Sequence, residues 1–250
     1  SSAASLSVSG ASDLGANVST TGAQTYTGAV TLSGADRTLT TTNSAVTFSG
    51  TLNSESGQNR ALTLALGTGQ ATFGGAVGGS QALGAVGITG TLDLNAAISG
   101  AASLTVSGAS DLGANVTTTG AQTYKGAVTL EADTVLSSSS GGDITFMTTV
   151  DGAQALEVKT SGVTIFTSNV GGSAPLKSLI TDEPGSVRVG ANSIKTTGLQ
   201  TFNDAVDLDA DVVFESTGQG DITFNGAVNG AHSLTVNTSG VTTFKQSIGA

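Results

Sequence analysis

The stretch Thr118–Leu130, TTGAQTYKGAVTL, occurs three times in the chain and decides how the rest is interpreted. Thr20–Leu32 reads TTGAQTYTGAVTL, and Thr196–Leu208 reads TTGLQTFNDAVDL. Copies this close are the signature of a repeat architecture, in which each unit packs chiefly against its neighbours. The offsets between copies are 118 − 20 = 98 and 196 − 118 = 78, and five and four units give periods of 98/5 = 19.6 and 78/4 = 19.5. The spacing therefore predicts coils of about 20 residues, within the range of solenoid repeats.

Two further motifs repeat at the offset that separates the second and third copies. Gly142–Val158 aligns with Gly220–Val236, and Ser161–Phe166 (SGVTIF) aligns with Ser239–Phe244 (SGVTTF). Because residue positions are copied as well as composition, we expect equivalent residues of successive coils to lie one above another, Phe on Phe and Val on Val.

Each unit holds two or three short runs with period-2 alternation, rich in Thr, Val, Ile, Tyr and Phe, which favours strands. Gly, Ser, Asn and Asp separate the runs, and the two-residue turns that antiparallel hairpins need at every reversal are mostly missing. The pattern predicts an all-β, parallel β-helix (β-solenoid) of about 20 residues per coil, with roughly 13 coils (250/19.6) and little or no helix. A β-sandwich array of ~100-residue domains is the alternative.

Residues 1–250 are expected to form a single continuous solenoid segment cut from a longer repetitive protein. The polar stretch Asn53–Arg60 (NSESGQNR) is predicted to be a loop lengthened outward from one coil, since the rim of a repeat tolerates insertion. Both prolines, Pro175 and Pro184, are expected at corners because proline removes a ladder donor.

Composition narrows the function classes. The 250 residues include 36 Gly, 10% charged residues and 4% aromatic residues, so the core must be thin. The net charge of −10 and the eight scattered basic residues predict no nucleic-acid surface and no site for anionic lipid. Cysteine is absent, which excludes disulfides and thiolate chemistry, and no apolar run predicts membrane insertion.

The motifs GDITFNGAVNGAHSLTVNTSGVTTF and TTGAQTYKGAVTL resemble the β-strand repeats of very large bacterial surface proteins, the filamentous-haemagglutinin-like and autotransporter-type adhesins. The resemblance covers essentially the whole chain. It implies a right-handed parallel β-helix, exported as an extended rod to the extracellular side of the outer membrane. It specifies a repeat class and no particular ligand.

Charged residues offer few candidate sites. Asp207, Asp209 and Asp211 form the densest acidic set, and a period of two would place all three on one outward strand face. Calcium needs six or more oxygens, so this face is either part of a calcium site or, as we favour, a hydrated face that resists edge pairing. His232 is the only histidine, and the sequence has no Ser or Cys nucleophile motif with which it could form a catalytic triad. It is therefore expected in a solvent-facing turn.

Uncharged candidates favour structural interpretations. Asn17, Asn115 and Asn192 each follow a Gly-Ala pair, and stacked Asn amides can hydrogen-bond along a coil. Gly171-Gly172 is expected at a corner because no phosphate-loop motif follows it. Two tyrosines occupy the position of Phe202 in their copies and are expected at the edge of the core: Tyr26 and Tyr124. The threonine runs are explained by the preference of threonine for strands: Thr40–Thr42, Thr117–Thr119 and Thr196-Thr197.

We therefore expect no catalytic, cofactor-binding or metal-binding residue, and a structural segment of a bacterial surface fibre or adhesin. Its partners would be neighbouring repeats or another copy stacked end to end, with a cell-surface glycan as a further candidate. The alternatives are a module that binds glycan or ice through an outward Thr/Asp face, and a polysaccharide-degrading enzyme. The enzyme would need clustered Asp beside a basic residue, for which Arg188 and Lys195 are the nearest in sequence.

Overall fold

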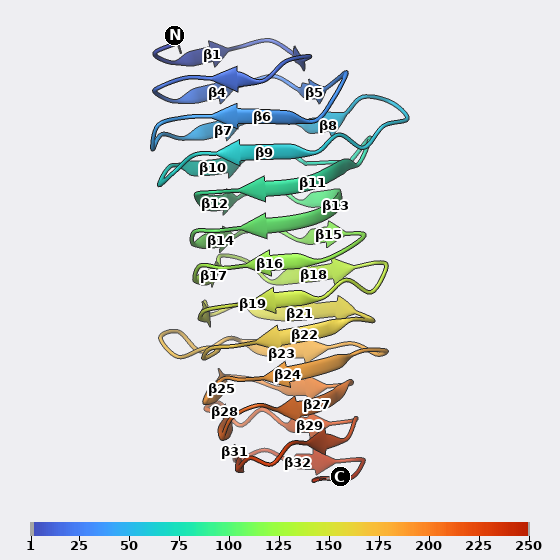
Figure 1. Cartoon of the computed structure of the whole chain (residues 1–250). Helices are drawn as coiled ribbons and strands as arrows, with labels where there is room; N and C mark the ends of the chain where they lie inside the picture. The colour runs from blue at the N-terminus through green and yellow to red at the C-terminus, as the bar shows by residue number, and fades with distance from the viewer. Residues whose placement is uncertain (1–2, 250) are drawn as a thin grey trace. The chain divides into compact units, whose positions relative to one another are not determined.

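A computed structural model describes residues 3–249, which form 32 short strands and no helix. The chain divides into two compact units, an N-terminal unit ending at Thr119 and a C-terminal unit beginning at Gly120. In each unit the strands of successive turns pair in parallel and in register, so each unit is a parallel β-solenoid (Figure 1). The prediction of an all-β solenoid without helix is confirmed, and the sandwich alternative is wrong. The described residues offer no helix capable of crossing a bilayer.

The N-terminal unit has three faces. The first contains β1 (Leu6–Val8), β4 (Gln24–Tyr26), β7 (Val46–Phe48), β10 (Gln70–Phe73), β12 (Thr91–Leu94) and β14 (Ser110–Leu112). The second contains β2 (Ser12–Leu14), β5 (Val30–Leu32), β8 (Leu52–Ser54), a bridge at Val77, the start of β13 (Ile98–Val106) and β15 (Val116–Thr118). The third contains β3 (Val18–Ser19), β6 (Arg37–Thr40), β9 (Leu62–Ala65), β11 (Leu83–Ile88) and the rest of β13.

The C-terminal unit repeats this plan. Its first face contains β16 (Gln122–Tyr124), β19 (Ile144–Phe146), β22 (Val163–Phe166), β24 (Ser186–Val189), β27 (Ala205–Leu208) and β30 (Val228–Asn229). Its second contains β17 (Val128–Leu130), β20 (Val150–Asp151), a bridge at Val170, β25 (Ser193–Thr196), β28 (Val212–Ser216) and β31 (Leu234–Asn237). Its third contains β18 (Thr134–Ser138), β21 (Ala155–Thr160), β23 (Ser178–Thr181), β26 (Gln200–Phe202), β29 (Ile222–Phe224) and β32 (Thr242–Phe244).

The turns are longer and fewer than the sequence predicts. The offset from Leu6 to Ser110 is 110 − 6 = 104 over five paired steps, and the offset from Gln122 to Ile248 is 248 − 122 = 126 over six. Both give about 21 residues per turn, with about 11 turns instead of 13. The copies with offsets of 78 and 98 are therefore about 3.7 and 4.7 turns apart. The predicted coil of about 20 residues is close to the observed turn of about 21, whereas the predicted count of 13 is too high, because the copies are not separated by whole turns.

A fractional number of turns moves a copied motif to another face. Tyr124, in β16, lies on the first face of the C-terminal unit, whereas its counterpart Phe202, in β26, lies on the third. Each heads its own stack, with ring centroids 5.0–5.4 Å apart and planes within 11° of parallel, and such stacks add to the burial of the rings. The stacking of like residues is thus confirmed, although the two copies lie on different faces. The two stacks are Tyr124–Phe146–Phe166 and Phe202–Phe224–Phe244.

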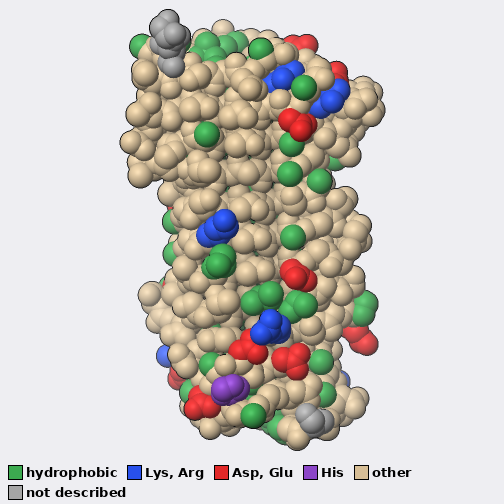
Figure 2. Space-filling model, viewed as in Figure 1, with side chains coloured by type: hydrophobic (Ala, Val, Ile, Leu, Met, Phe, Trp, Pro, Cys, Tyr) green, Lys and Arg blue, Asp and Glu red, His purple; other side chains and the backbone are tan. Residues whose placement is uncertain are grey.

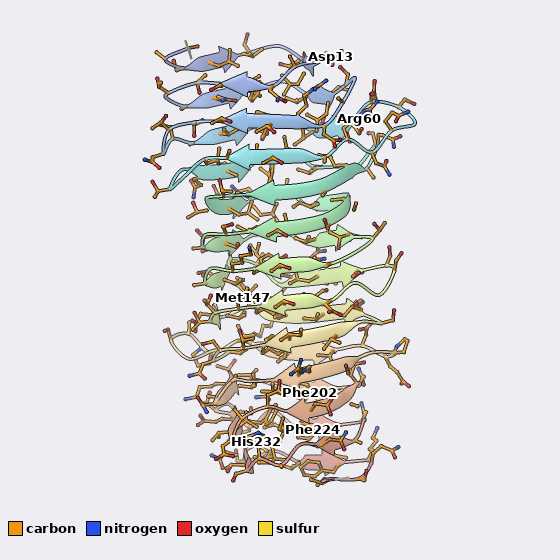
Figure 3. The ribbon with its side chains drawn as sticks, in the orientation of Figure 1. Asp13, Arg60, Met147, Phe202, Phe224 and His232 are labelled. Carbon is orange, nitrogen blue, oxygen red and sulfur yellow. The ribbon has the colours of Figure 1, made fainter. Side chains whose placement is uncertain are left out.

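Inward positions alternate along each three-residue strand, and most carry fully buried Val, Leu, Ile or an aromatic residue. Phe202 and Phe224, labelled in Figure 3, are fully buried in this core, where Phe214 of β28 meets both rings edge-on at 5.2 and 5.1 Å. Tyr26 and Tyr124 are also fully buried, so the prediction that they lie at the core edge is wrong.

Corners bring successive turns into close backbone contact. A Cβ added at Gly28 would lie 2.4 Å from the carbonyl of Gly10, and one added at Gly50 would lie 2.4 Å from the Gly28 oxygen. Such distances leave no room for a side chain. Pro175 and Pro184 lie outside the strands, as predicted. The outward loop predicted over Asn53–Arg60 is confirmed, although its first two residues, Asn53 and Ser54, belong to β8.

Candidate functional site

The predicted acidic face does not form. Only Asp207 lies in a strand, β27, while Asp209 and Asp211 lie in the corner that follows it. Asp209 pairs with Arg188 Nη2 at 2.7 Å, and Asp207 Oδ1 accepts a hydrogen bond from Asn229 Nδ2 at 3.3 Å. The three carboxylates therefore have separate partners, and the prediction of one outward strand face is wrong.

The basic residues and the histidine lie apart from one another. Lys195 of β25 pairs with Glu215 at 2.9 Å, whereas Arg188 of β24 pairs with Asp209, so the two cations lie on different strands and pair with different acids. His232 is exposed in a bend, as predicted (Figure 3), with Nδ1 3.6 Å from Asp211 Oδ1. On the face shown in Figure 2, charged side chains form small scattered groups and no continuous patch of one sign.

Threonines form single files rather than broad arrays. In the N-terminal unit Thr25, Thr47 and Thr72 are outward neighbours in register on the first face. In contrast, the first threonine of the TTG motif points inward: Thr20 and Thr196 are buried, and their hydroxyls donate to the carbonyls of Gly22 and Gly198. The paired threonines therefore do not present two outward rows.

Many acids and asparagines tie one turn to the next, a role that the sequence does not reveal. In each case the side-chain Oδ1 accepts a backbone N–H of the following turn, 20 to 27 residues later, at 2.8–3.1 Å. These bonds satisfy N–H groups, at corners and in strands, that would otherwise need another acceptor. The pairs are Asn17 with Thr38, Asp36 with Ala61, Asn43 with Thr68, Asn53 with Ser80, Asp133 with Ala155, Asp143 with Val163, Asp151 with Ser173, Asn169 with Asn192, Asp211 with Ser233 and Asp221 with Val241.

The predicted asparagine stacking is not found at Asn17 or Asn192. Asn17 Oδ1 caps a backbone N–H, and Asn192 donates from Nδ2 to the Asp211 carbonyl at 3.1 Å, so neither stacks on another amide in these contacts. A side-chain ladder does occur elsewhere, where Asn225 Nδ2 donates to Asn203 Oδ1. Asn203 in turn donates from Nδ2 to the Thr181 carbonyl at 2.7 Å.

This ladder borders a polar groove of about 390 Å³ in the C-terminal unit, which is a candidate site. Its lining includes Glu183, Asn203, Asp204, Asn225 and Gln246, at the corner where the third face meets the first. Asp204 is only 3% exposed. Oδ1 of Asp204 and Oδ1 of Asn225 are both buried without a hydrogen-bond partner. Two residues with unpaired acceptor oxygens therefore line one small cavity.

The electrostatics of the groove are unfavourable for a charged carboxylate. Burial raises the pKa of Asp204 to about 6, the Thr181 hydroxyl opposes the rise, and the negative charges of Asp182 and Glu183 add to it. Elsewhere the opposite holds: the Ala155 N–H and Lys177 lower the pKa of the exposed Asp133 carboxyl. Asp204 thus differs from the corner acids, whose carboxylates accept a backbone N–H of the next turn.

Sequence reasoning did not select Asp204, although a signal was present. Gln200, Phe202 and Asp204 alternate with period two, which predicts that Asp204 points inward with the other two. No known protein family, curated protein or solved structure matches the chain significantly.

Proposed function

We propose that the chain is a structural segment of a bacterial extracellular fibre or adhesin, with no catalytic role of its own. One observation carries the proposal most directly: in each unit, strands of successive turns pair in register, with like residues stacked and corners tied by Asp and Asn. Such a fold adds length by adding turns, because each turn chiefly contacts its neighbours.

The surface supports a passive role. Within residues 3–249, no group of three or more His, Cys, Asp or Glu side chains is placed to hold a metal ion. Arg188 and Lys195, the cations that a polysaccharide-degrading site would need, are each paired with a different acid. The expected partners are neighbouring repeats of the same polypeptide.

Immunogold electron microscopy of the source cells tests this proposal. An antibody raised against the purified chain should label fibres or projections outside the outer membrane, and protease added to intact cells should abolish the labelling. Labelling confined to the cell interior, or protease resistance on intact cells, would contradict an extracellular fibre.

Binding of glycan or ice through the outward face is the second candidate. The observation in its favour is the register of Thr25, Thr47 and Thr72, which places three hydroxyl-bearing side chains in one file. A Thr47→Val variant should reduce thermal hysteresis or glycan-array binding if this file is the binding surface. Absence of both activities in the parent chain excludes this candidate and leaves the fibre proposal unchanged.

A further inference from the structure

The groove beside Asp204 is lined by two residues, Asp204 and Asn225, whose Oδ1 atoms have no hydrogen-bond partner. The orientation of Asn225 follows from its neighbours, because the Thr181 carbonyl can only accept. Asn203 must therefore direct Nδ2 to that carbonyl and Oδ1 to Asn225 Nδ2, which leaves Asn225 Oδ1 without a donor. The orphaned acceptor is thus a consequence of the ladder itself.

Asp204 adds a carboxylate that is nine-tenths buried and has no donor at Oδ1. The groove also contains Glu183, and no Lys, Arg or His side chain is part of its lining. Lys245, which precedes Gln246 in the chain, is not among the lining residues either. Buried polar groups without partners are costly, and a buried charge without a counter-charge more so. The groove therefore has an uncompensated excess of oxygen and negative charge.

We propose that this groove binds a divalent cation of the calcium type, with Asp204 Oδ1 and Asn225 Oδ1 as protein ligands. Calcium prefers carboxylate and amide-carbonyl oxygens and accepts water in its remaining positions. Glu183 supplies the second carboxylate of the groove. A cation fits better than a neutral saccharide because it offsets charge as well as filling acceptor positions. With only two carboxylates we expect weak binding, with a Kd on the order of 1 mM.

Thermal unfolding of the whole 250-residue chain tests the site. In chelator-treated buffer at pH 7.5, 10 mM CaCl2 should raise Tm by about 3–6 °C, and NaCl of equal ionic strength should not. Asp204→Asn keeps the shape of the side chain and removes its charge, so it should abolish the calcium-dependent rise. Asp221→Asn is the matched control: Asn retains the oxygen that caps Val241, so its calcium-dependent rise should equal that of the parent chain.

The same titration followed by NMR covers the case in which a variant fails to fold. Calcium should shift the side-chain amide signals of Asn225 and the backbone signal of Asp204 in the parent chain, and leave Asp221 unchanged. A parent chain without a calcium-specific rise in Tm, an equal rise in Asp204→Asn, or shifts confined to residues outside the groove would each overturn the proposal. None of these outcomes affects the fibre proposal, which does not depend on calcium.

Discussion

Two copies of one motif in the C-terminal unit differ at a few positions, and the differences show what each position does. Gln122–Leu130 reads QTYKGAVTL, and Gln200–Leu208 reads QTFNDAVDL. In the first, the Tyr124 hydroxyl donates to Gln122 Oε1 at 3.0 Å, inside the core. In the second, Phe202 has no hydroxyl, and Gln200 Oε1 is buried without a partner. Both copies form two consecutive short strands, whereas the hydrogen bonding of their buried polar groups differs.

The same pair of copies differs at the corner. Gly126 of the first copy corresponds to Asp204 of the second, and Lys125 corresponds to Asn203. The second copy therefore gains a buried carboxylate and an amide ladder where the first has a glycine and an exposed lysine. The first copy has a satisfied core, and the second has three orphaned oxygens, on Gln200, Asp204 and, through the ladder, Asn225. We infer that the unpaired buried oxygens make the second copy less stable than the first, and that they accompany its polar groove.

The largest expected effect tests whether the two aromatic stacks are equivalent. Phe224→Ala should cost about 3–5 kcal/mol, because it opens a cavity in a packed core. Phe146→Ala should cost less, since Phe146 has stacked neighbours only, whereas Phe224 also meets Phe214 edge-on at 5.1 Å. Denaturant unfolding followed by circular dichroism measures both losses. A larger loss for Phe146→Ala would show that the edge-on contact contributes nothing.

Much of this stack could be predicted from the sequence, because aromatic residues copied at nearly regular spacing indicate in-register turns. The turn length could not be derived from the copies alone. On a three-faced solenoid a strand motif suits any face, so copies need not be separated by whole turns, and Tyr124 and Phe202 lie on different faces. Dividing the offsets between copies by whole numbers of units therefore gives a turn length that is slightly too short.

The corner residues were harder to interpret for a different reason. An Asp at a corner caps an N–H of the next turn, and its partner depends on the local offset between turns, as for Asp143 with Val163. The sequence shows such an acid as polar and says nothing of its partner. Asp204 was predictable as inward-facing from the alternation with Phe202, but the unpaired state of its Oδ1 depends on three-dimensional neighbours.

Next in size is the pH dependence of Asp204, which sharpens the difference at the corner. Its folded pKa of about 6 lies above the model-peptide value of 3.8, so its contribution to stability is fully present below about pH 4 and lost as pH rises through 6. In EDTA, Asp204→Asn should therefore gain up to about 3 kcal/mol relative to the parent chain between pH 4 and pH 8. Denaturant midpoints measured across this range give the difference, and a constant offset would show that Asp204 titrates normally.

A smaller effect is expected from converting the first copy into the second at its aromatic position. Tyr124→Phe should destabilise the chain by about 1–2 kcal/mol, because it leaves the buried Gln122 Oε1 without its donor. Burial raises the pKa of the Tyr124 phenol far above its usual value, so the hydroxyl stays neutral and able to donate at any ordinary pH. Unfolding free energies from denaturant titration provide the measurement. An unchanged stability would mean that another donor, such as water, replaces the hydroxyl.

The reverse substitution is the most specific test, although its effect is the smallest. Phe202→Tyr should place a hydroxyl near Gln200 Oε1, as Tyr26 does for Gln24 at 3.2 Å, and stabilise the chain by about 0.5–1.5 kcal/mol. The gain should vanish in a Gln200→Met background, which removes the acceptor at similar side-chain length, so a double-mutant cycle isolates the new hydrogen bond. A gain that persists in Gln200→Met would have to come from the packing of the tyrosine ring. A loss in both backgrounds would instead show that Phe214, edge-on to Phe202 at 5.2 Å, leaves no room for a hydroxyl. In that case the phenylalanine of the second copy is required by its neighbour, and the orphaned Gln200 oxygen is a consequence of the third aromatic ring.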